Sequence, residues 1–149
     1  MSAAGKVPVK SARRRARELA VQGIYQWRLT GADLALIEKQ MREEKKLGNY
    51  DAKFFGELLR GALAQHADLE AAIAPCLDRP LAELSPVEFS VLLLAAYELL
   101  QHPEIPYKVI INEAVDLAKT YGGTDGHRFV NGVLDKLAAQ VRAVEVAAR

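Results

Sequence analysis

One segment, LSPVEFSVLLLAAYELLQ at residues 84–101, constrains the fold more than any other part of the sequence. Its start is a capping box, with Ser85 at the N-cap and Glu88 at the third helical position, and Pro86 stands at the first. The helix that follows is apolar on nearly every side, which is typical of a helix that is buried all round. We therefore expect a helix to about Gln101 that lies at the centre of the fold.

The periodicity of apolar residues is helical almost everywhere else, and no run of alternating β-branched residues predicts a strand. The fold class is therefore all-α. Pro80 lies near the midpoint, so we expect two small helical bundles that share one core. The further helices are expected at about residues 11–30 with Ser11 as the cap, 33–46, 52–74, 106–121 and 125–144. The expected division is a single domain over 1–149, with a disordered basic tail at 1–10, an N-terminal bundle at about 11–79 and a C-terminal bundle at about 80–146.

The composition excludes several classes of protein. A chain of 149 residues is long enough for one domain with a sizeable core. No apolar run approaches the roughly 18 residues of a membrane helix, and the first residues lack the apolar stretch of a secretory signal. We therefore expect a cytoplasmic protein with no membrane contact. The lone Cys76 allows no internal disulfide and is expected to be a small core residue.

Signals for chemistry are weak. The three histidines, His66, His102 and His127, show no ligand spacing with acidic residues. The segment GGTDG lacks the lysine of a phosphate-binding loop and follows no strand, and no motif of a catalytic nucleophile occurs. We therefore expect no catalytic site, no metal and no cofactor, and the chain is not predicted to be an enzyme.

Charge is unevenly distributed. Residues 1–28 carry seven basic side chains and one acidic one, a net charge of +6, so the remainder carries −5 in a chain of net charge +1. Arg13, Arg14, Arg15 and Arg17 repel one another at a helix N-terminus, where the macrodipole prefers anions. We expect something outside the helix to offset this repulsion, and a polyanion bound on one face would do so. The alternative is a solvated basic arm without a partner.

A helical wheel of residues 11–30 places one basic strip outside the predicted core stripe. Arg14, Arg17, Val21, Tyr25 and Arg28 follow one another on it at spacings of three or four residues. Arginines bind phosphates and stack on bases, and an aromatic ring adds a stacking or docking surface. The strip therefore predicts an RNA or partner surface. The alternative is that Val21 and Tyr25 pack beneath another helix of the same protein.

The last predicted helix offers a second candidate surface. Phe129 lies roughly 80° from the centre of that helix's apolar stripe, by the count of 100° per residue. His127 and Arg128 flank it at the start of the helix. An aromatic side chain beside basic groups can stack on a nucleobase. The alternative is that Phe129 closes the hydrophobic core from the side.

Four stretches, taken together, resemble a known family. ARRRARELAVQGIYQW, VEFSVLLLAAYEL, IPYKVIINEAVDLAKTYG and HRFVNGVLDKL occur in the order found in the NusB family of transcription antitermination factors. The resemblance covers about residues 12–140, and the pair PYKVIINEAVDLAK and FVNGVLDK is its most specific part. It implies about seven helices arranged as two three-helix bundles.

The resemblance also implies a function and partners. NusB-like proteins pair with a small-subunit ribosomal protein, also called NusE, bind the single-stranded boxA element of ribosomal RNA transcripts, and join an antitermination complex on RNA polymerase. The implied RNA contacts match Arg13, Arg14, Arg15, Arg17, Asp125, Arg128 and Phe129. The implied contacts with the ribosomal protein match Tyr25 and Glu88, and Val21 is adjacent on the wheel.

Two alternative functions remain open at this stage. One is the NusB-like RNA-binding module of a ribosomal RNA methyltransferase, although the chain ends where the helical domain ends. Another is a protein–protein scaffold whose arginines meet an acidic partner and never contact RNA. In addition, exposed Val21 and Tyr25 could drive homodimerisation when the partner is absent.

Overall fold

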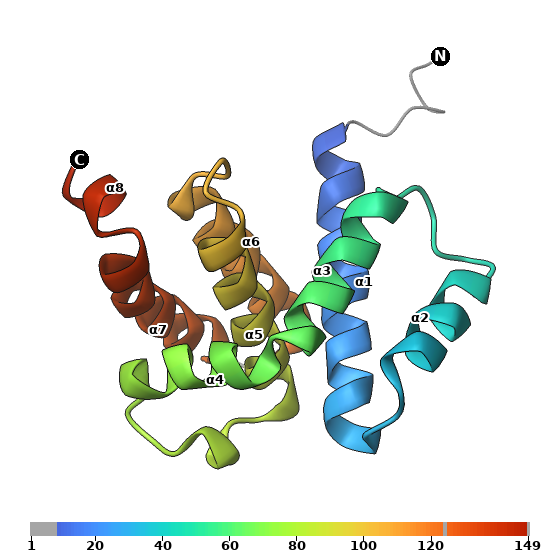
Figure 1. The fold of residues 1–149 in the computed structure, drawn as a ribbon, viewed down its shortest axis with the longest axis horizontal. Helices are drawn as coiled ribbons and strands as arrows, with labels where there is room; N and C mark the ends of the chain where they lie inside the picture. The colour runs from blue at the N-terminus through green and yellow to red at the C-terminus, as the bar shows by residue number, and fades with distance from the viewer. Residues whose placement is uncertain (1–8, 124, 149) are drawn as a thin grey trace.

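The structure is a computed structural model that describes residues 9–123 and 125–148. Within those residues it consists of α-helices and two short 3-10 helices, with no strand (Figure 1). The all-α fold class is therefore confirmed. The elements are α1 Val9–Thr30, α2 Leu34–Glu43, α3 Ala52–Ala64, α4 His66–Ile73, η2 Ala74–Cys76, η3 Leu81–Glu83, α5 Pro86–Gln101, α6 Tyr107–Tyr121, α7 Gly126–Val141 and α8 Ala143–Ala147.

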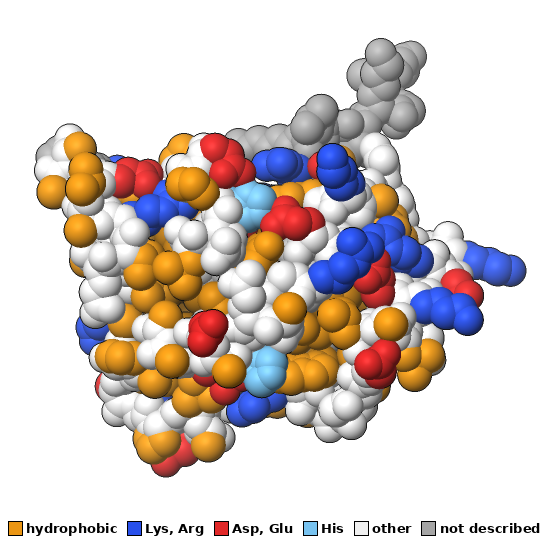
Figure 2. Space-filling view, in the orientation of Figure 1, with side chains coloured by type: hydrophobic (Ala, Val, Ile, Leu, Met, Phe, Trp, Pro, Cys, Tyr) orange, Lys and Arg blue, Asp and Glu red, His pale blue; other side chains and the backbone are white. Residues whose placement is uncertain are grey.

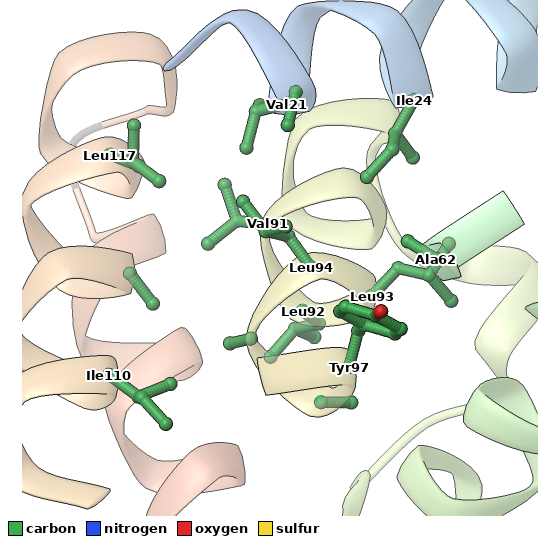
Figure 3. Packing of buried hydrophobic residues seen from close by; sticks show 14 of the residues in the cluster. Val21, Ile24, Ala62, Val91, Leu92, Leu93, Leu94, Tyr97, Ile110 and Leu117 are labelled. Atoms are coloured by element: carbon green, nitrogen blue, oxygen red, sulfur yellow. The ribbon is translucent and has the colours of Figure 1, made fainter. Parts of the chain in front are cut away.

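Helix α5 is the centre of the fold, as its sequence predicts. The capping box is formed, because the Glu88 amide donates to Ser85 Oγ at 3.1 Å and the Ser85 amide donates to Glu88 Oε1 at 3.1 Å. Every residue from 89 to 99 is buried. The helix packs against α1, α3, α4, α6 and α7. Figure 3 shows its side chains meeting Val21 and Ile24 of α1 on one side and Leu117 of α6 on another.

The remaining helices pack around α5 in two groups. On one side, α1 packs against α2 and α3, and on the other α6 packs against α7 (Figure 1). The single core includes Cys76, which is buried as predicted. The boundary between the bundles near residue 80, and the assignment of all 149 residues to one domain, stay predictions. No helix among the described residues combines the length and apolar character of a membrane span.

The first helix begins earlier than predicted. Helix α1 starts at Val9, so Ser11 lies inside it and is not its cap. Of the predicted disordered tail, Val9 and Lys10 are helical, and residues 1–8 lie outside the described residues. The end is as expected, because Gly31 adopts a φ of 68° and its amide donates to the Trp27 carbonyl at 2.8 Å. The second helix is also shorter than predicted, since it runs from the N-cap Asp33 only to Glu43.

Two predicted helices are interrupted. The segment 52–74 breaks at Gln65, whose backbone has φ −106° and ψ 15°. The last helix breaks at Arg142, with φ −124° and ψ 38°. The buried Arg142 guanidinium donates to the carbonyls of Leu99, His102 and Ile105 at 2.8–3.1 Å. Three charge-assisted hydrogen bonds to carbonyls in and just after the last turn of α5 hold the Arg142 guanidinium in place, and these bonds offset the interruption of the regular helix.

Candidate nucleic-acid interface

Arg17 is buried and paired, which the wheel did not predict. Only 5% of the residue is exposed. Its Nε donates to Glu98 Oε2 and its Nη2 to Glu98 Oε1, each at 2.9 Å, and Nη1 lies 3.6 Å from Glu113 Oε1. The expectation that Arg17 projects into solvent is wrong, because α1 is covered on two sides, by α3 and by α5. A wheel with one apolar stripe does not anticipate a second buried side.

Arg14 lies at the border of the same cluster. Its side chain is 48% exposed, and its Nη2 is 2.7 Å from Glu113 Oε2 and 3.1 Å from Asp116 Oδ2. The pKa of Arg14 is raised above its ordinary value, and the hydrogen bond to Glu113 is the largest cause. We call Arg14, Arg17, Glu98, Glu113 and Asp116 the α1 ion-pair network. It ties the start of α1 to α5 and α6.

The other two arginines of the cluster also have internal partners. Arg15 donates to the Leu47 carbonyl at 2.8 Å and to Glu18 Oε1 at 2.9 Å. The Arg13 guanidinium lies 4.1 Å above the centre of the Phe54 ring. The repulsion between the arginines is therefore offset by the chain's own groups, and the expectation that an outside polyanion is needed for this is wrong. The Arg13 side chain nevertheless remains 40% exposed.

An apolar pocket of about 310 Å³ opens beside α1. It is lined by Val21, Gln22, Tyr25, Val87 and Tyr121. Tyr25 is 38% exposed, as predicted, whereas Val21 is only 3% exposed. The expectation of an exposed Val21 is therefore wrong, and the alternative that it packs beneath another helix is confirmed. Val21 still lines the pocket from inside, and Gln22 Nε2 closes one side by donating to the Tyr121 hydroxyl at 3.1 Å.

Glu88 lies next to this pocket at the start of α5. One carboxylate oxygen, Oε1, accepts the capping-box hydrogen bond, and the other, Oε2, lies near Gly126 at the start of α7. The pocket residue Val87 precedes it, and Val87 Cγ1 borders Gly122. Tyr25, Glu88 and the beginning of α7 therefore all surround the N-terminal end of α5.

The predicted residues at the start of α7 differ in exposure. Asp125 and Arg128 are exposed. Phe129 is partly buried and packs against the hydrophobic core, so the alternative that it closes the core is confirmed in part. Sequence reasoning missed Arg79, whose guanidinium lies 4.3 Å above the centre of the Phe129 ring. No local pattern connects two residues so far apart in the chain.

Basic side chains are concentrated on one part of the surface. In the view of Figure 2, Lys and Arg side chains gather over the half of the molecule built by α1, α2 and α3, with Asp and Glu between them. Among the described residues no group of three or more His, Cys, Asp or Glu side chains could hold a metal ion.

Comparison with known proteins identifies the family. The model of the NusB family matches residues 14–139. A transcription antitermination protein NusB of Ralstonia nicotianae is 58% identical over 144 residues, which are 97% of this chain and 93% of the relative. The corresponding protein of Nitrosospira multiformis is 59% identical over 133 residues, which are 89% of this chain and 84% of the relative.

Solved structures agree with these sequences. NusB of T. maritima superposes with a TM-score of 0.77 at 30% identity, covering 95% of this chain and 99% of the other. A crystal structure of the antitermination factors NusB and NusE in complex with double-stranded RNA contains a chain with a TM-score of 0.77 at 29% identity, covering 85% of this chain and 96% of the other. The match over most of the length, in sequence and in fold, shows that the chain belongs to the NusB family.

Proposed function

We propose that this chain is a transcription antitermination factor that binds boxA RNA of ribosomal RNA transcripts together with the ribosomal protein NusE and joins an antitermination complex on RNA polymerase. The observation that carries the proposal is the 58% identity to a transcription antitermination protein NusB over nearly the whole chain. The structural likeness to a NusB solved with NusE and RNA supports both partners. The proposal places the protein in the cytoplasm, where bacterial transcripts are made, and includes no catalytic step.

The proposed RNA surface combines two groups of side chains. The side chains of Arg13, Arg14 and Arg15 are partly exposed and neutralise phosphates. Exposed Arg128 adds a further cation at the start of α7, and Asp125 can accept hydrogen bonds from base amino groups. The Phe129 ring lies beside them and contributes to the stacking of an RNA base. Arg17 does not belong to this surface, because its guanidinium is buried and paired with Glu98.

The proposed protein partner docks beside the start of α5. Tyr25 supplies an exposed ring at the apolar pocket, buried Val21 lines that pocket, and Glu88 supplies a carboxylate for a basic group on NusE. An apolar pocket flanked by a charge is typical of the centre and rim of a protein interface. A second copy of the chain would compete for the same pocket when NusE is absent.

The test is a binding titration of boxA RNA against a scrambled RNA, with and without NusE. Arg14→Ala should weaken boxA binding and lower the magnitude of the log–log salt slope by about 0.7, the value for one phosphate contact with a single strand. Lys45→Ala removes the same charge from an exposed position after α2 and is the matched control. Equal affinity for both RNAs, or binding to NusE with no affinity for either RNA, would instead indicate a protein–protein scaffold.

A further inference from the structure

Arg79 and Phe129 form a cation–π pair at the edge of the proposed RNA surface. Arg79 lies in the turn between η2 and η3, and its Cζ is 4.3 Å from the centre of the Phe129 ring. The ring packs on the hydrophobic core, whereas the Arg79 side chain is 40% exposed. One face of the ring is therefore already covered by a planar cation, and a base could reach that face only by displacing it.

The orientation of the guanidinium is fixed from one edge. Arg79 Nε donates to Asp78 Oδ1 at 2.8 Å and Nη2 to Oδ2 at 3.5 Å. Among the described residues Nη1 donates to no partner. Since Cζ lies over the ring, Asp78 holds one edge and the side chain is 40% exposed, the group keeps exposed surface and one donor for a ligand. A guanidinium is planar and can stack on a nucleobase as an aromatic ring does.

We propose that Arg79, held over the Phe129 ring and oriented by Asp78, is the surface on which one nucleobase of the RNA stacks. The inference rests on the proposed RNA-binding function and adds a contact residue to it. It also changes the role expected of Phe129, which becomes the support beneath the stacking group. Exposed Arg128, the residue before Phe129, is placed to bind the phosphate next to that base.

The experiment measures the affinity of the complex with NusE for boxA RNA and for a series of boxA RNAs that each lack one base. Arg79→Ala should lower the affinity for intact RNA about tenfold, within the range measured for the loss of one stacked base. Removal of the stacked base should lower the affinity of the unchanged protein by a similar factor. In Arg79→Ala the same removal should cost nothing further, while removal of any other base keeps its full effect.

Two variants separate stacking from charge. Arg79→Lys keeps the positive charge without the plane, so it should lose nearly as much affinity as Arg79→Ala while its salt slope stays that of the unchanged protein. Arg60→Ala is the matched control, because Arg60 is an exposed arginine paired with a single carboxylate, that of Glu38, in another part of the surface. It should bind RNA normally.

Three results would overturn the inference. The first is normal RNA binding by an Arg79→Ala protein that unfolds at the usual temperature, in an assay where Arg14→Ala does weaken binding. This result would remove Arg79 from the interface and leave the proposed function intact. Normal binding by Arg79→Lys would reduce the contact to a phosphate charge. If the unchanged protein with NusE does not prefer boxA RNA to scrambled RNA, the proposed function and this inference fail together.

Discussion

Replacing Arg17 by alanine should damage the fold and leave the RNA surface intact. Glu98 is 2% exposed, and both of its carboxylate oxygens accept hydrogen bonds from Arg17 at 2.9–3.1 Å. Arg17→Ala leaves that carboxylate buried without its cation. Breaking a buried ion pair in this way costs about 3–5 kcal/mol of folding free energy. At about 2–4 °C per kcal/mol for a chain of this size, the melting temperature should fall by roughly 6–20 °C.

The assay combines thermal and urea unfolding at pH 7 with RNA titration well below the melting transition of the variant. The folded Arg17→Ala protein should bind boxA RNA with nearly normal affinity and an unchanged salt slope. Arg14→Ala should instead bind RNA more weakly, with a smaller salt slope, and lose little stability. The double replacement Arg17→Met with Glu98→Leu removes both charges, so it should recover much of the lost stability. A melting temperature within about 2 °C of the unchanged protein, which is less than about 1 kcal/mol, would refute the reasoning. So would weakened RNA binding by a fully stable Arg17→Ala.

Two further predictions concern the contact between α3 and α5. Gly61→Ala should destabilise the protein by about 1–3 kcal/mol, measured by urea unfolding, because the added methyl group would overlap the ring and hydroxyl of Tyr97. Burial disfavours the charged form of His102, but hydrogen bonds to Glu104 and Glu57, each 2.7 Å long, raise its pKa on balance. The resulting stability should be complete below a pH of about 6.5, the unfolded value, and be lost as pH rises through the folded pKa. His102→Gln should flatten that slope in urea unfolding at a series of pH values, and an unchanged slope would contradict the assignment.

The features that the sequence predicts well are those that depend on neighbouring residues. The capping box of Ser85 and Glu88 and the glycine stop at Gly31 each involve hydrogen bonds between residues within four positions of one another. The break at Arg142 depends on carbonyls about 40 residues away in the chain. Local periodicity carries no information about such partners, so the predicted helix continued through the break.

The same distinction applies to the candidate site. The wheel correctly placed Tyr25 outside the core, because its exposure depends on the direction of one helix face. It misplaced Arg17, whose partner Glu98 lies 81 positions further along the chain. Arg79 was not predicted at all, because only the folded chain brings it to Phe129.

The burial of α5 on every side has a consequence for how the molecule comes apart. A fragment ending before Pro86 would leave the inward surfaces of α1, α3 and α4 in water, and a fragment beginning there would expose the opposite flank of α5. Neither piece has a complete interior of its own, so severing the backbone between them should yield two unstructured peptides. Amide protons of α1 and of α7 should accordingly exchange with deuterium through one common global opening.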